Sequence, residues 1–94
     1  MMYKFLITIE LQPNTLDKIL EVAPKAQAAT RAEEGCLAYD FFTCTDDPNK
    51  LVFIECFTSK AAHDAHMEEA HTKEFIAFHE QFHKSLTFEV IEES

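Results

Sequence analysis

The chain has 94 residues, of which 47% are hydrophobic, with nine phenylalanines and a single glycine. This composition predicts one packed domain spanning residues 1–94 and excludes a disordered tail. Seventeen acidic against eight basic side chains give a formal net charge of -9, which excludes nucleic acid and anionic membrane surfaces as partners because both would repel the protein.

The N-terminal third predicts a strand followed by a helix. Apolar and polar side chains alternate from Tyr3 to Leu11, which is typical of a strand. QPNT, residues 12–15, supplies a break and a cap, and helical spacing of apolar side chains then predicts a helix from Thr15 to Glu33. Pro24 falls inside that helix and removes a backbone hydrogen bond, so we expect a kink or restart near Val22 to Pro24.

A hairpin is predicted after this helix. Gly35, the only glycine, is expected to end the helix in a left-handed conformation. The runs CLAYDFFTC (36–44) and LVFIECF (51–57) are rich in β-branched and aromatic residues, which favour strands. TDDPNK, between them, is typical of a turn.

Two short helices and a last strand complete the predicted order. Ser59 is placed to cap the first helix and Thr72 the second, and LTFEVIEE (86–93) predicts a strand. The order of strand, helix, strand, strand, helix pair and strand predicts an α+β fold. It is that of the ferredoxin-like plait (β-α-β-β-α-β), with an antiparallel sheet and helices on one face.

The opposite face of such a sheet also needs a cover. Either Leu37, Tyr39 and Phe41, or the alternate set with Phe42, would lie there. A second copy of the chain is the simplest cover, so we expect a homodimer.

The cysteines and the N-terminus bear on the compartment. Cys36, Cys44 and Cys56 form an odd set without a CxxC pair, which favours free thiols in a reducing cytoplasm. The N-terminal segment lacks the basic head and continuous apolar run of a signal peptide, and no segment is long enough to span a bilayer. We expect a cytoplasmic protein without a membrane partner.

All five histidines fall between Ala61 and His83. His63 and His66 are three residues apart and His79 and His83 are four apart, so each pair could share a helix face. No cysteine, HExxH motif or facial-triad spacing joins the pairs, and no metal site is predicted. His63 and His83 have charged neighbours and are expected on the solvent side.

The remaining histidines have alanine and phenylalanine neighbours, so His66, His71 and His79 can face the sheet. A partly buried imidazole has a tunable pKa near neutrality, as a general acid or base requires. The alternative for each is a histidine that is simply hydrogen-bonded in the core.

Three runs, EEGCLAYDF, FIECFTSKAAHDAHMEEAH and KEFIAFH, resemble the antibiotic biosynthesis monooxygenase (ABM) domain of the dimeric α+β barrel superfamily. The family pattern has an acidic residue and glycine before a strand, a glutamate in the return strand, a small residue followed by histidine, and a second histidine five residues on. The matching positions are Glu34, Gly35, Glu55, Ala65, His66 and His71. The resemblance implies a single ABM-like domain whose sheet pairs face to face with that of a second copy, with a pocket between sheet and helices.

Members of this family include quinol and anthrone monooxygenases that use dioxygen with no metal or flavin. They also include haem-degrading enzymes and an isomerase-like branch that acts on a phosphorylated signal molecule. The haem-degrading pattern is disfavoured here. The chain has no Trp, His66 falls where that Trp would be, and Ile9 replaces the expected Asn, although His79 is similar in position to the axial ligand.

The leading hypothesis is therefore a cofactor-independent monooxygenase that oxidises an electron-rich aromatic, such as a quinol or anthrone, with dioxygen. His66 or His71, with His79 third, is expected to be the base or a hydrogen-bond partner. Glu55 is expected to orient a histidine or to make a structural hydrogen bond. The candidates for an aromatic slot are Tyr39, Phe53, Phe75 and Phe78.

Two other functions fit the same residues. One is isomerisation or breakdown of a small carbonyl compound or phosphorylated signal molecule, but only Lys60, Lys73 and Lys84 lie near the histidines to hold a phosphate. The other is a non-catalytic dimeric ligand-binding protein. The cysteines are expected to be packing residues, since no neighbouring cation is evident that would lower a thiol pKa.

Overall fold

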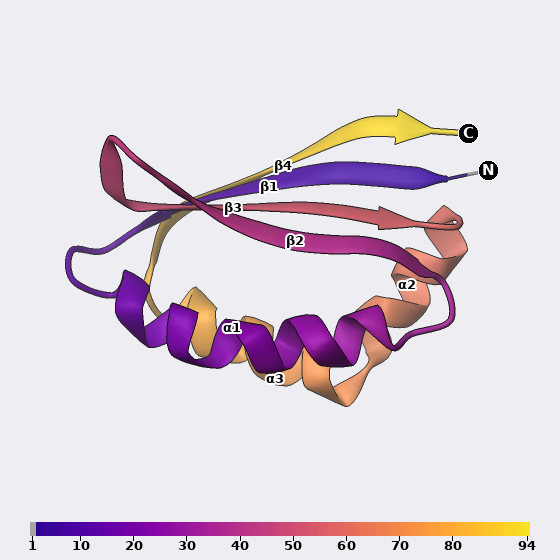
Figure 1. Cartoon of the computed structure of the whole chain (residues 1–94), viewed down its shortest axis with the longest axis horizontal. Coiled ribbons are helices and arrows are strands. Elements are labelled where there is room, and N and C mark those ends of the chain that lie inside the picture. Colours follow the sequence, from indigo (N-terminus) through magenta and orange to yellow (C-terminus); the bar gives the residue numbers. More distant parts are fainter. Residues whose placement is uncertain (1) are drawn as a thin grey trace.

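A four-stranded antiparallel sheet lies on one side of the molecule and three helices lie on the other in the computed structural model, which describes residues 2–94 (Figure 1). The elements in chain order are β1 (Tyr3–Leu11), α1 (Leu16–Arg31), β2 (Cys36–Cys44), β3 (Asp47–Phe57), α2 (Lys60–Glu68), α3 (Ala70–Glu80) and β4 (His83–Glu93). This order confirms the predicted α+β ferredoxin-like fold, including the helix pair.

The period-two pattern of β1 positions the core. The strand order is β2-β3-β1-β4, so β1 and β3 occupy the centre. Alternate residues of β1, including Phe5 and Ile9, face the helices, and their partners Glu55 and Leu51 on β3 face the same way. The main core cluster consists of Ile9, Leu11, Ile19, Ala23, Ala26, Tyr39, Leu51, Phe53 and Phe75.

Helix α1 runs without a break through Pro24, so the predicted restart near Val22 is wrong. The face of the helix that carries Ile19, Ala23 and Ala26 is buried against the sheet, whereas Pro24 is exposed. Burial of the apolar face stabilises the helix on both sides of the proline.

Gly35 serves a different purpose from the one predicted. Its φ is not positive, so a left-handed helix end is wrong. A Cβ at Gly35 would lie 2.6 Å from the Cβ of Ala62 on α2, a distance that real side chains do not reach. Glycine is therefore required because α2 packs directly on this segment, which also places Glu33, two residues earlier, beside His66 of α2 and His71 of α3.

The hairpin turn is shorter than predicted. Strand β3 begins at Asp47, so only Thr45 and Asp46 form the turn, and Pro48 and Asn49 belong to the strand. The Asp47 carboxylate accepts a hydrogen bond from the backbone N–H of Asn49 at 2.9 Å, within an irregular pairing that admits a proline.

Of the caps predicted for the two short helices, one is confirmed and the other is wrong. Ser59 caps α2 as predicted, because its hydroxyl accepts a hydrogen bond from the N–H of Ala62 at 3.0 Å. Thr72 does not cap α3, which already begins at Ala70, and is instead buried beside His66. Neither of these helices nor α1, within residues 2–94, is long and apolar enough to cross a membrane.

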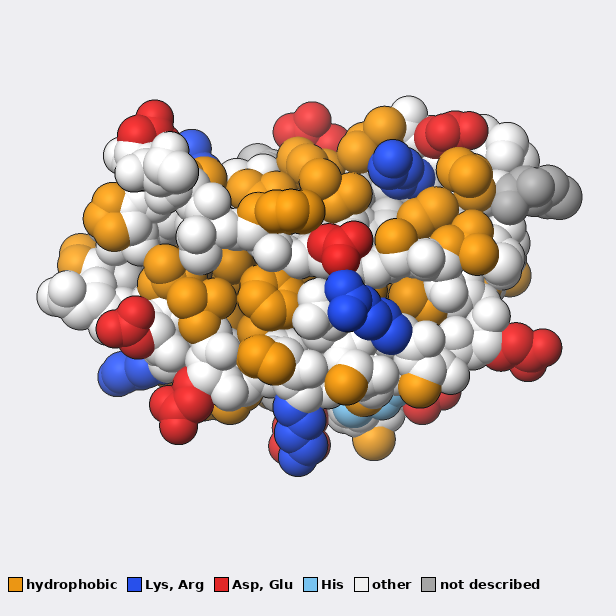
Figure 2. All heavy atoms as spheres, viewed as in Figure 1, with side chains coloured by type: hydrophobic (Ala, Val, Ile, Leu, Met, Phe, Trp, Pro, Cys, Tyr) orange, Lys and Arg blue, Asp and Glu red, His pale blue; other side chains and the backbone are white. Residues whose placement is uncertain are grey.

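The sheet face turned away from the helices is uncovered and partly apolar. Phe42 on β2 pairs with Val52 on β3, and both face outward with Ile54 and Leu6. Phe42 is 50% exposed, whereas Tyr39 points to the helices, so the alternate set with Phe42 lies on this face. Figure 2 views the molecule from the side, as Figure 1 does, and shows hydrophobic side chains gathered over its upper and middle parts, with acidic and basic side chains meeting near the centre.

Candidate active site

A cavity of about 330 Å³ lies between the sheet and helices α2 and α3. Strands β1, β2 and β3 form its floor, and α1 and β4 contribute to its sides. Its aromatic walls come from Tyr39, Phe53, Phe75 and Phe88, and each of the five histidines lines it: His63, His66, His71, His79 and His83. The histidine segment is thus neither a solvated helix face nor a single cluster, but the polar half of one pocket.

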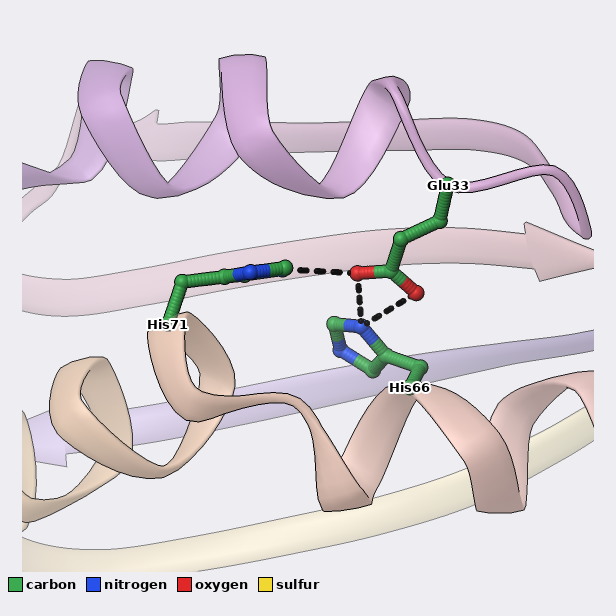
Figure 3. Close-up of side chains that lie close together, drawn as sticks. All are labelled: Glu33, His66 and His71. Atoms are coloured by element: carbon green, nitrogen blue, oxygen red, sulfur yellow. Dashed lines mark hydrogen bonds and ion pairs between the residues drawn. The ribbon is translucent and has the colours of Figure 1, made fainter.

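At one end of the cavity a carboxylate joins two histidines from different helices (Figure 3). Glu33, in the segment after α1, has one carboxylate oxygen 2.8 Å from Nδ1 of His66 and 2.7 Å from Nε2 of His71. The side chains of Glu33 and His66 are only 14% and 5% exposed. Charge-assisted hydrogen bonds with this little solvent are strong, and they fix the orientation of both rings.

These contacts define the tautomer of His66. Because the Glu33 carboxylate accepts at Nδ1, that nitrogen carries the proton and Nε2 of the neutral ring keeps its lone pair. Nε2 lies 4.0 Å from a carboxyl oxygen of Glu55, which is too long for a hydrogen bond. A lone pair and a carboxyl group therefore face one another across a gap at the cavity wall, and a hydroxyl group could fit between them.

Glu55 on β3 is the unusual acid of the site. It is 4% exposed, and among the hydrogen bonds of residues 2–94 its carboxyl group has none. Burial, and then the negative charge of Glu33, raise the pKa of Glu55 to about 8. At pH 7 the carboxyl group is mostly protonated and can donate a hydrogen bond. Burial, and then Glu55, also raise the pKa of Tyr39, so its phenol keeps its proton.

His79 belongs to the other end of the cavity. Its Nδ1 lies 2.8 Å from Nε2 of His83, and the two rings stack. Burial, and then His83, lower the pKa of His79 to about 4, so the ring is neutral and a poor proton acceptor at pH 7. The structure therefore separates His79 from the pair His66 and His71 with which it was grouped from the sequence.

The two histidines predicted to face solvent are both partly buried. His63 packs edge-on against Phe5, with ring centroids 4.6 Å apart, and also contacts Tyr3 and Phe57. Burial lowers the pKa of His63 and also that of His83. The charged neighbours in the sequence misled the prediction, because on a helix adjacent residues point in different directions.

Three of the four predicted slot residues, Tyr39, Phe53 and Phe75, line the cavity. The prediction for Phe78 is wrong. Its side chain lines a separate hollow of about 210 Å³ between α1 and α3. Residues four apart on a helix share a face more closely than residues three apart, so His79 follows Phe75 into the cavity while Phe78 turns toward α1. Phe88 takes the fourth aromatic position.

Sequence reasoning missed Glu33. Of the adjacent glutamates in EEG, the pattern singled out Glu34, which is exposed, whereas Glu33 points inward between the two helices. No spacing rule connects Glu33 with His66 and His71, more than thirty residues away. The only available signal was the pair of acids placed before a glycine. Cys36 is close by, but burial, and then Glu33, raise the pKa of its thiol to about 11, so it is no nucleophile at neutral pH.

Comparison with known proteins assigns the family. The family model described as "Antibiotic biosynthesis monooxygenase" (ABM) matches residues 2–78, from β1 to α3. The chain belongs to the ABM family. The matched residues include Glu33, Glu55, His66 and His71, so the family model covers the polar end of the cavity.

Individual proteins and structures are also similar to this chain. The chain is 33% identical over 69 residues to the Bacillus subtilis protein named "Putative monooxygenase YcnE", with 73% of each protein covered. It is 25% identical over 68 residues to Synechocystis protein sll1783, of which it spans only 46%. A crystal structure titled as an antibiotic biosynthesis monooxygenase superposes with a TM-score of 0.90 at 27% identity, covering 100% of this chain and 99% of the other.

Proposed function

We propose that this ABM protein is a cofactor-independent monooxygenase that uses dioxygen to oxidise an electron-rich aromatic of the quinol or anthrone type. The observation that carries the proposal is the facing pair at the cavity wall, the free Nε2 of His66 and the carboxyl of Glu55, 4.0 Å apart. A phenol hydroxyl placed between them can donate to the imidazole and accept from the protonated acid.

His66 acts as the base in this scheme. Its Nε2 removes the proton of the phenol or of the carbon next to the carbonyl, and Glu33 stabilises the resulting imidazolium at Nδ1. Glu55 donates a hydrogen bond to the oxygen anion that forms. His71 supports the same carboxylate through its Nε2. Proton removal is the step that the protein must assist, because the substrate anion is the species that reduces dioxygen.

The rest of the reaction uses the substrate's own electrons. The anion transfers electrons to dioxygen and forms a carbon–oxygen bond, giving a hydroperoxide after proton return from the imidazolium. In an anthrone, loss of water from the hydroperoxide turns the reacting carbon into a carbonyl, so that its CH₂ group and dioxygen become C=O and water. The aromatic walls hold the flat ring and exclude solvent from the anion.

The cavity favours an uncharged aromatic over a phosphorylated ligand. Glu80 lines it and the carboxylate of Glu33 stands behind His66, so the negative charges in and around it would repel a phosphate. Phe53 and Phe75 meet edge to face, with centroids 6.1 Å apart, and offer apolar surface to a flat ring. Breakdown of a phosphorylated signal molecule is the less favoured function for this reason.

Oxygen consumption tests the proposal. Chelator-treated protein is expected to consume dioxygen with at least one member of a panel of hydroquinones and anthrones, and to place one atom of labelled dioxygen in the product. Rates are measured with an oxygen electrode and products by mass spectrometry, with the heat-denatured protein as the control for autoxidation. If no panel member is turned over while one is retained unreacted, the protein is a ligand-binding module.

We further propose that the uncovered sheet face pairs with the same face of a second copy. Light scattering is expected to give a mass of twice the 10.8 kDa chain. Ile54→Glu, at the centre of that face, is expected to give monomers, because burying an unpaired carboxylate opposes association. Ala28→Glu, on the exposed side of α1, is the matched control and should leave the mass unchanged. A monomeric wild type would refute the pairing.

We propose a cytoplasmic location because the three cysteines, Cys36, Cys44 and Cys56, are free thiols.

A further inference from the structure

The polar end of the cavity brings together more than an acid–base pair. Nδ1 of His66, Nε2 of His71 and the carboxylate of Glu33 all lie within 4.8 Å of one another. The three donors come from three parts of the chain, namely α2, α3 and the segment after α1, and all point to a common centre (Figure 3). Two imidazoles and one carboxylate are donors that zinc, iron and cobalt bind in proteins.

The spacing of the donor atoms is close to that of ligands around a metal ion. The nitrogen–oxygen distances are 2.7, 2.8 and 3.1 Å. Ligands about 2.1 Å from a zinc ion are separated by about 3.0–3.5 Å, so the shared Glu33 oxygen needs to withdraw from each nitrogen by only a few tenths of an ångström. The two nitrogens themselves lie within 4.8 Å of each other. His71 is 28% exposed in its side chain, which leaves an approach for an ion.

The surrounding charge also favours a cation. The neighbouring lysines are engaged elsewhere, Lys60 with Asp64 and Lys73 with Glu68, in exposed ion pairs. The chain as a whole carries a formal charge of -9, which raises the local cation concentration.

A partner for the far side of a metal-bound imidazole is present as well. A metal ion at Nδ1 of His66 would leave the ring proton on Nε2, which lies 4.0 Å from Glu55. Metal-bound histidines commonly donate their other N–H to a carboxylate, and this contact needs only a small approach of Glu55. Thr72, with its hydroxyl 3.2 Å from Nδ1 of His66, adds an oxygen beside the ion.

We propose that Glu33, His66 and His71 form a binding site for one divalent transition-metal cation, such as Zn²⁺ or Co²⁺. The site goes beyond the proposed monooxygenase reaction, which needs none. A bound cation takes the place of the proton between Glu33 and Nδ1 of His66, and the single ring proton of the neutral imidazole moves to Nε2. The base is then blocked, so the cation is an inhibitor of that reaction.

Cobalt titration of the chelator-treated full-length protein tests the site. We expect one Co²⁺ per chain, with visible absorption bands of nitrogen and oxygen coordination, and displacement by Zn²⁺. Glu33→Gln and His71→Ala are each expected to weaken binding by at least about tenfold. Glu34→Gln, the same change on the exposed neighbour, and His83→Ala, which removes a histidine of the other cavity end, should bind as the wild type does.

The outcomes separate this site from the proposed function. Absence of saturable Co²⁺ binding overturns the site, as does binding that Glu33→Gln and His71→Ala leave unchanged or that His83→Ala abolishes. Circular dichroism of each variant identifies losses caused by misfolding, and the partly exposed His71 is the variant least expected to unfold. Failure of the monooxygenase proposal would appear instead as absent oxygen uptake by metal-free protein, whatever the cobalt titration gives.

Discussion

His66→Ala and Glu33→Gln are each expected to lower kcat for oxygen uptake by about 10²-fold or more, with a smaller change in KM. A positioned base contributes about 10²–10⁴ to a rate, and His66 is the base in the proposed mechanism. Glutamine keeps the size of Glu33 but lacks the negative charge that stabilises the imidazolium, 2.8 Å away. Steady-state kinetics of chelator-treated protein on the best substrate of the panel measures both constants.

Two comparisons make this prediction specific to catalysis. Glu34→Gln makes the same chemical change one residue away on an exposed side chain and should keep wild-type kinetics. Added imidazole should restore part of the activity of His66→Ala, which a purely structural histidine would not allow. A rise in KM at unchanged kcat would mean that these residues only bind the substrate.

The stability of the wild type is expected to fall by about 2 kcal/mol between pH 6.5 and a pH of about 8.5 because of Glu55. The unfolded chain loses the proton of this carboxyl near its ordinary pKa of 4.5, whereas the folded state holds it up to a pKa of about 8. The folded state therefore binds more protons in this window, and rising pH destabilises it. Urea unfolding followed by circular dichroism at a series of pH values measures the effect.

The window lies above most of the pH range in which His79 acts. The pKa of His79 is lowered to about 4 from an ordinary value of 6.5, so its contribution to stability rises with pH mainly between those values, and only a small part of the rise remains above pH 6.5. Glu55→Gln should remove the fall above pH 6.5 and exceed the wild type in stability at the upper end of the range. Glu21→Gln, on the exposed side of α1, should keep the wild-type slope. A wild type with flat stability in the window would contradict the buried, protonated Glu55.

The element order was predictable because it depends on local patterns. Alternation in β1 and the helix signals after Ser59 depend on side chains a few residues apart, and the structure confirms the elements they predict. The errors occurred where a distant contact overrode a local preference. The position of Gly35 in the sequence predicts a helix end. The structure shows instead that a larger residue is excluded there by the side chain of Ala62, which lies on another helix.

The candidate site was only partly predictable for the same reason. His66, His71, His79 and Glu55 were recognisable from their types and neighbours, and all four line the cavity, whereas His63 and His83, which also line it, were predicted to face solvent. Their grouping was not, since His79 pairs with His83 and leaves His66 and His71 to share Glu33. Periodicity reports which face of its own element a residue occupies, and it contains no information about which faces of different elements meet.

The amino-acid sequence by itself determined the α+β fold, the ABM family and the presence of acid–base side chains in an aromatic-rich chain. Short-range spacing and composition are sufficient for the fold and the side-chain types, and the resemblance of three sequence runs to the family is sufficient for the assignment to it. The tertiary structure alone decided that Glu33 joins His66 and His71, that Glu55 stays protonated near neutrality, and that Phe78 lies outside the cavity. These properties arise from burial and from distances between segments remote in the chain, which exist only after the helices have packed on the sheet.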